Sequence, residues 1–99
     1  MSTDAECAVV RLPSVVDLKA VGALQAEFLA VRGRPVDVDA RDVTRLGGLG
    51  LQVLMSAKST WRSDANDFRV VEPSEDFLKA LQLFGAPHLE AAALEEPRP

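Results

Sequence analysis

Three short valine-containing runs, two apolar and one that alternates apolar and polar residues, constrain the fold of this chain more than any other feature, and each is followed by a segment with helical spacing. The runs are Ala8–Leu12, Pro35–Asp39 and Phe68–Val71, and they are rich in valine. Short runs of β-branched residues bounded by turn formers are typical of strands. The order strand, helix, strand, helix, strand, helix predicts an α/β layered fold, because each helix has an apolar face that a sheet must cover.

The helices between these runs have recognisable ends. Apolar residues recur at helical spacing in each, and capping residues flank them. The first helix is expected over about residues 18–32, and the second is expected to open at a glycine-rich turn and to run to about Ser63. The expected caps and terminators are Asp17 and Gly33 for the first helix, and Ser74 and Gly85 for the third. Val15–Val16 is expected as a second short extended piece, and residues 41–46 as a loop.

Length and charge exclude several classes of protein. The 99 residues predict a single domain, with a core over about residues 8–85 and a tail over residues 86–99. The net charge is −4, from 11 Lys and Arg against 15 Asp and Glu. A nucleic-acid partner is not expected, because phosphate contacts need a basic face.

Metal, membrane and secretory signals are also missing from the sequence pattern. The one cysteine, Cys7, and the one histidine, His88, lie far apart in the chain, so neither a zinc site nor another cofactor is expected. No apolar run is long enough to span a membrane. The acidic start of the chain does not resemble a signal peptide, and a lone cysteine fits a reducing compartment, so we expect a cytoplasmic protein.

The segment from Val36 to Leu54 carries the most specific pattern. A strand ending at Asp39 leads through Val43-Thr44 into Gly47-Gly48-Leu49-Gly50, which opens the second helix. This resembles the signature of the STAS family, in which a strand ending in Asp-Leu leads through a Val-Thr loop into Asp-Ser-Ser-Gly-Leu at a helix start. The resemblance extends from about Ala8 to Gly85. It implies a STAS-like α/β fold with a small mixed sheet, helices packed mainly on one side and no catalytic activity.

The chain departs from the family signature at the helix start. When Gly50 is aligned with the family glycine, Gly47 takes the place of the aspartate, Gly48 that of the first serine and Leu49 that of the second serine. That second serine is the residue that is phosphorylated in the anti-anti-sigma factors. Leucine has no hydroxyl to accept a phosphate, so phosphorylation is expected to be absent at this position. Either the protein is always competent to bind, or another group switches it.

The resemblance implies a partner protein and a surface for it. The Gly-Gly-Leu-Gly context looks most like the small STAS proteins of chemotaxis clusters, so the leading hypothesis is a signalling module that binds a histidine kinase. The alternatives are an anti-sigma factor antagonist without the phosphorylation switch, whose partner is an anti-sigma kinase, and an accessory subunit of a lipid ABC transporter. The predicted partner-binding residues are Thr44, Gly47, Gly48, Leu49, Gln52 and Ser56.

Each of these features also has a structural explanation. The three glycines are better explained by a turn that needs positive φ and close packing than by a phosphate cradle, since no Gly-Lys-Ser/Thr follows. Leu49 is either an exposed anchor or a cap on the core. Thr44 and Ser56, with Ser59, are considered as substitute phosphate acceptors, although most such hydroxyls lie on ordinary solvated surfaces.

A catalytic reading of the sequence has little support. Asp37 and Asp39 alternate along one strand, so they point to the same face. No nucleophile, histidine or metal cluster joins them, and an active site needs several convergent groups. The two side chains are expected to be solvated carboxylates, or Asp39 is expected to cap the following loop. Trp61 and the phenylalanines fall at core spacing and are expected to be packing residues.

Overall fold

The computed structural model describes residues 7–85 of the chain, as three helices and five short strands in two sheets. The predicted tail and His88 lie outside these residues. The strands are β2 (Ala8–Arg11), β3 (Val15–Val16), β4 (Val36–Asp39), β5 (Arg45–Leu46) and β6 (Phe68–Val71). The helices are α1 (Leu18–Ala30), α2 (Gly48–Ser63) and α3 (Glu75–Leu83).

All strand pairs within the described residues are parallel. One sheet has the order β2-β4-β6, in which Val10 lies beside Val38 and Val38 beside Val70. A second, two-stranded sheet pairs β3 with β5. The expectation of a mixed sheet therefore does not describe residues 7–85. Each paired strand is reached through a connection that includes a helix, and such crossovers return the chain in the same direction.

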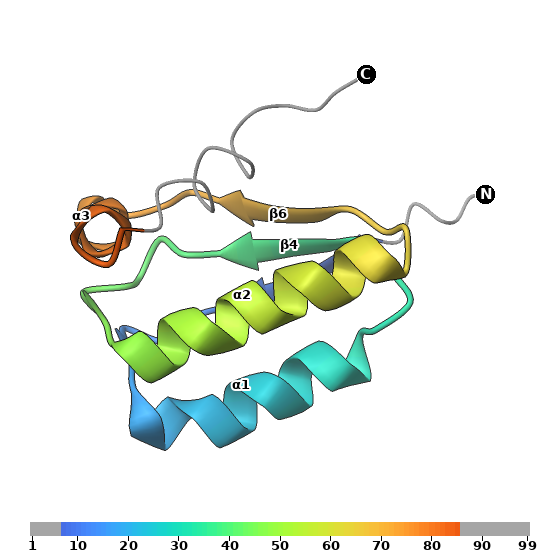
Figure 1. Cartoon of the computed structure of the whole chain (residues 1–99), viewed down its shortest axis with the longest axis horizontal. Coiled ribbons are helices and arrows are strands. Elements are labelled where there is room, and N and C mark those ends of the chain that lie inside the picture. Colours follow the sequence, from blue (N-terminus) through green and yellow to red (C-terminus); the bar gives the residue numbers. More distant parts are fainter. Residues whose placement is uncertain (1–6, 86–99) are drawn as a thin grey trace.

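The helices cover one face of the larger sheet, as expected. Figure 1 shows α1 and α2 side by side along the strands, with α3 at the end to which the strand arrows point. The core lies between the sheet and the helices. Its central side chains are fully or almost fully buried, and they include Val36, Val38, Leu54, Trp61 and Phe77.

Most of the expected elements are confirmed, with differences at their ends. Asp17 and Ser74 are the N-caps of α1 and α3, and each side chain accepts a hydrogen bond from a backbone N–H of its first turn. The first helix ends at Ala30, earlier than expected. The segment 41–46 is not a loop throughout, because Arg45–Leu46 pairs with Val15–Val16.

All of the aromatic residues except Phe84 lie in the core or pack against it. Phe28, Trp61 and Phe68 form a cluster with ring centroids about 6 Å apart, in the edge and tilted arrangements that aromatic pairs favour. Phe77 is buried as well. Phe84 differs from the expectation, since 48% of its surface is exposed. Phe84 is the C-cap residue of α3, one position beyond the last residue of the helix.

Candidate functional site

The start of α2 is held in place by the small sheet. Gly47 is its N-cap, and the Gly47 N–H donates to the Val16 carbonyl oxygen at 2.9 Å. The Gly47 carbonyl accepts the first bond of the helix, from the Leu51 N–H at 3.0 Å. Because glycine has no side chain, no side-chain hydrogen bond caps this helix. The hydrogen bond to the Val16 backbone therefore fixes this turn, in place of a polar side-chain cap.

Gly50 is required by close packing. A Cβ atom at this position would lie 2.6 Å from both the carbonyl oxygen and Cγ1 of Val16. The expected close packing of the glycines is therefore confirmed here. The expected positive φ is wrong for the turn, because the glycines with positive φ in residues 7–85 are Gly33 and Gly85, which follow α1 and α3.

Thr44 has a structural role in this neighbourhood. Its hydroxyl donates to the Ser14 carbonyl oxygen at 3.1 Å, and its backbone N–H donates to the same oxygen at 2.7 Å. These bonds align the segment before β5 with the segment before β3. The side chain of Thr44 is exposed, but its hydroxyl hydrogen is engaged with the chain itself.

The predicted residues on α2 lie on one side of the helix but are spread along its length. Gly48, Leu49 and Gln52 are exposed on the first turns, and 47% of the Leu49 surface is accessible. Leu49 is therefore not a cap on the core. Ser56 lies two turns further along, about 10 Å from Leu49 by helix geometry. It lines a groove between α1 and α2 together with Gln25.

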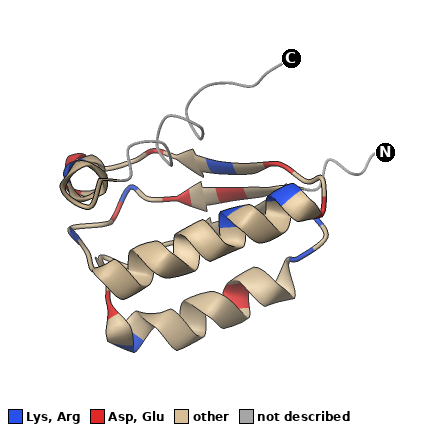
Figure 2. Cartoon of the chain, viewed as in Figure 1, with Lys and Arg blue, Asp and Glu red and all other residues tan. Residues whose placement is uncertain are grey.

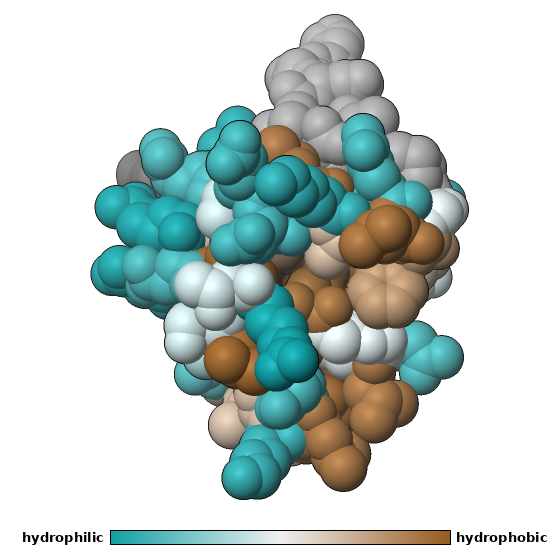
Figure 3. All heavy atoms as spheres, turned by 90° about the vertical axis from the view of Figure 1, so that its left-hand side faces the viewer, coloured by the Kyte–Doolittle hydropathy of each residue, from teal (hydrophilic) through white to brown (hydrophobic). Residues whose placement is uncertain are grey.

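Sequence reasoning missed the apolar residues that surround this helix start. Leu18, at the start of α1, and Leu83 and Phe84, at the end of α3, are exposed. Phe84 Cε1 would lie 3.9 Å from a Cβ on Gly48, and Asp17, the residue before Leu18, would lie 3.9 Å from a Cβ on Gly47. We call Leu18, Leu49, Leu83 and Phe84 the apolar end of the molecule. Figure 3 shows apolar side chains gathered on this end.

The apolar end has little charge beside it on α2. No charged residue occurs between Arg45 and Lys58, and Figure 2 shows the first half of α2 without charged residues. The signal that could have located Leu83 was present in the sequence. Leu83 falls outside the stripe formed by Phe77 and Leu81, so the helical period itself places it on the outer side of α3.

The carboxylates of β4 are engaged in ion pairs. Asp37 accepts from the Arg69 guanidinium at 3.2 Å, and Asp39 accepts from the Arg41 backbone N–H and guanidinium at 3.0 Å. The expectation that Asp39 caps the following loop is confirmed. Burial alone would raise the pKa of Asp39, but the hydrogen bonds from Arg41 outweigh it, and the pKa is lowered. Both groups have structural partners, which favours a structural role for them.

Within residues 7–85, no three His, Cys, Asp or Glu side chains gather closely enough to hold a metal ion. None of the helices in this part of the chain combines the length and the apolarity needed to cross a membrane.

The fold and this surface together define a small parallel α/β domain that exposes apolar side chains around an uncharged helix start. The family model described as "Mlab, STAS domain" matches residues 1–94, so the chain belongs to this STAS family. Domains of this family are generally non-catalytic and bind partner proteins. The comparison with curated proteins found no match. The family membership confirms the STAS resemblance, and it supports the transporter alternative better than the chemotaxis hypothesis.

Proposed function

We propose that this protein is an accessory subunit that docks on the ATPase of a lipid ABC transporter. The observation that carries the proposal is the match to the MlaB-type STAS family over residues 1–94. The chemotaxis hypothesis rests on the Gly-Gly-Leu-Gly context and the residues Leu51–Trp61 that follow it. The family match gives that context no support, so the transporter alternative becomes the main proposal.

The docking surface in this proposal is the start of α2 together with the apolar end. Leu49 and Phe84 are half-exposed apolar side chains, with the bare backbone of Gly48 beside Phe84. Apolar anchors within a polar rim are where small protein interfaces concentrate their affinity. Gln52 belongs to that rim. Gly47 and Gly48 have no side chain, so a partner can approach their backbone closely. Thr44 stabilises the segment beneath this surface through its two hydrogen bonds to the Ser14 carbonyl oxygen.

Replacement of Leu49 by glutamate tests the docking surface. The fold should tolerate the change, because Leu49 is half-exposed and a carboxylate is favourable near a helix N-terminus. Met55→Glu is a matched control, since Met55 is also partly exposed on α2 but lies six residues beyond Leu49, about 9 Å further along the helix axis. We expect Leu49→Glu to weaken partner binding at least tenfold, or by about 1.4 kcal/mol, while Met55→Glu binds as the wild type does.

The measurement is affinity capture from the source organism's lysate, with the wild type and both variants as baits. Recovery of an ABC ATPase that is lost only with Leu49→Glu supports the proposal. Recovery of a histidine kinase would restore the chemotaxis hypothesis instead. Recovery of an anti-sigma kinase would support the antagonist alternative. An ATPase that binds all three baits equally would show that the docking surface lies elsewhere.

A further inference from the structure

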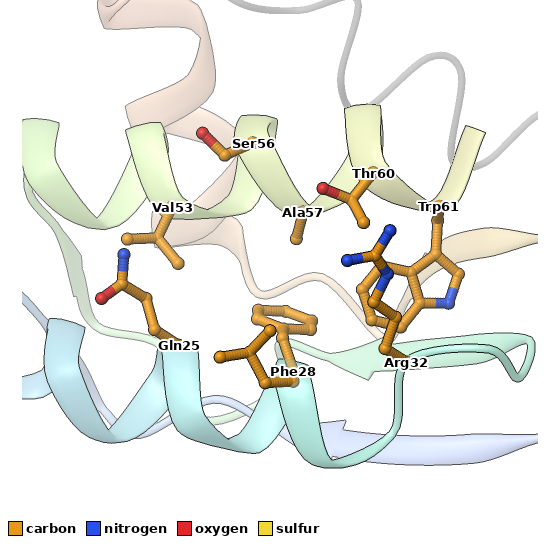
Figure 4. A pocket seen from close by; sticks show the side chains of 9 residues that line it. Gln25, Phe28, Arg32, Val53, Ser56, Ala57, Thr60 and Trp61 are labelled. Atoms are coloured by element: carbon orange, nitrogen blue, oxygen red, sulfur yellow. The ribbon is translucent and has the colours of Figure 1, made fainter. Parts of the chain in front are cut away.

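A groove runs between α1 and α2 on the side of the helices that faces away from the sheet. Its volume is about 310 Å³, at the lower end of the range of ligand pockets. The floor is apolar and is formed by Phe28 of α1 with Val53, Ala57 and Trp61 of α2. Figure 4 shows these side chains pointing into the space between the two helices.

The polar groups of the groove stand at its edges. Gln25 lies on the α1 edge, and Ser56 and Thr60 lie on the α2 edge. Arg32 is the one charged residue among those that line it, and Figure 4 shows its guanidinium beside Trp61 at one end. A groove with an apolar floor, a few hydroxyls and a single cation at one end is complementary to a small molecule with an apolar body and one anionic head.

Arg32 has capacity for such a head. Its Nε and Nη2 atoms donate to the two oxygens of Asp64 at 2.9 and 3.2 Å. A guanidinium has five N–H groups, so others stay free to donate. Within residues 7–85, Asp64 is the one side chain that Arg32 bonds. The pair with Asp64 also holds the guanidinium at the end of the groove, so its position is set before a ligand arrives.

We propose that this groove binds a medium-chain fatty acid, with the acyl chain over Val53 and Ala57 and the carboxylate on Arg32. The single apolar floor fits one chain better than two, and the small volume favours a short one. The groove shares no residue with the apolar end, and Ser56 is the one predicted partner-binding residue among those that line it. The inference does not depend on the identity of the partner protein.

The lone tryptophan provides a direct test. Trp61 is the only Trp and the chain has no Tyr, so the intrinsic fluorescence reports on this groove. The purified full chain is titrated with a terminally brominated medium-chain fatty acid, whose bromine quenches a tryptophan in contact with it. We expect saturable quenching. The brominated alcohol of the same length should bind about tenfold more weakly, because it lacks the charge that pairs with Arg32.

Two variants assign the quenching to the groove. Arg32→Gln should lower the affinity for the acid to that for the alcohol and leave the alcohol unchanged. Ala57→Phe should fill the floor and remove quenching by both ligands. If Ala57→Phe does not fold, as judged by circular dichroism, the acid–alcohol comparison on Arg32→Gln still decides the question.

Three results would overturn the inference. One is the absence of saturable quenching, and another is equal affinity of the acid for the wild type and Arg32→Gln. The third is stronger quenching by vesicles of a brominated neutral phospholipid than by the free acid, which would indicate a membrane surface as the occupant. Because no partner is present, any of these results leaves the docking proposal standing, and loss of partner capture leaves this one standing.

Discussion

At the scale of single residues, Gly50 sets the distance between α2 and the small sheet. Its missing side chain lets the first turn of the helix lie against the Val16 backbone. The neighbouring Gly48 faces open space, with Phe84 as the nearest group at 3.9 Å from a Cβ position. Two glycines of one short motif therefore have different physical roles, one in packing and one at the surface.

Alanine substitutions separate these two roles. Gly50→Ala should destabilise the protein by about 2 kcal/mol, because the new methyl group overlaps a backbone oxygen that cannot move freely. Gly48→Ala should be neutral or stabilising by up to about 1 kcal/mol, since alanine favours a helix and the space is open. Urea unfolding midpoints measure both changes. Equal effects of the two substitutions would contradict the packing role of Gly50.

At the scale of elements, the helix starts are stabilised in different ways. α1 and α3 begin with side-chain caps, whereas α2 begins at a glycine. Ser74 contributes two bonds: its Oγ accepts from the Phe77 N–H at 3.0 Å and donates to the Val43 carbonyl oxygen at 2.6 Å. The second bond attaches the start of α3 to the loop before β5.

Ser74→Ala should therefore cost more than the loss of an ordinary cap. We expect a loss of about 1–2 kcal/mol, because one substitution leaves both the Phe77 N–H and the Val43 carbonyl without their partner. Asp17→Ala is the matched control, since Asp17 caps α1 but makes only the cap bond, to the Lys19 N–H. Its expected loss is about 1 kcal/mol or less. A larger loss for Asp17→Ala, measured by urea unfolding, would contradict the bridging role of Ser74.

The sequence predicted elements well wherever a local signal exists. The caps Asp17 and Ser74, the strands of the larger sheet and the end of α2 at Ser63 all have such signals. The strand β5 has only two residues and is defined by its pairing with β3, which no local pattern reveals. The apolar end is likewise formed by the starts of α1 and α2 and the end of α3, so it depends on tertiary structure.

At the scale of the whole molecule, acidic and basic side chains form ion pairs on the sheet face that the helices do not cover. Figure 2 shows acidic residues on β4 beside one basic residue on β6. The ion pairs of this sheet are Arg69–Asp37 between neighbouring strands, Arg41–Asp39 at the carboxyl end of β4, and Arg11–Asp42 between β2 and the loop after β4. Asp39 is the one charged residue that is buried within the described part of the chain.

Asp39 should make the stability of the protein depend on acid pH. Hydrogen bonds from Arg41 lower its pKa in the folded protein below the unfolded value, which is near 3.9. The carboxylate therefore stabilises the fold above that pH, and the contribution is lost as the pH falls through the lower, folded pKa. Asp39→Asn should be less stable at neutral pH and should show a flatter decline below about pH 4.

Urea midpoints measured across this pH range test the expectation. Asp64→Asn is the control: the hydrogen bond from Arg32 also lowers the pKa of Asp64, but the pair is exposed and screened by water. Its removal should change stability little. A decline that is as steep in Asp39→Asn as in the wild type would assign the acid sensitivity to other groups.

The leucine at the start of α2 also bears on how an assembly of this protein would be controlled. A serine at that point gives a complex two covalent forms, and a kinase and a phosphatase then decide between them. With Leu49 there, the surface has one chemical form at that position. Occupancy of the partner then follows from the dissociation constant and the amounts of the two proteins. The ratio in which the cell synthesises the two chains becomes the controlling quantity, as for a constitutive subunit.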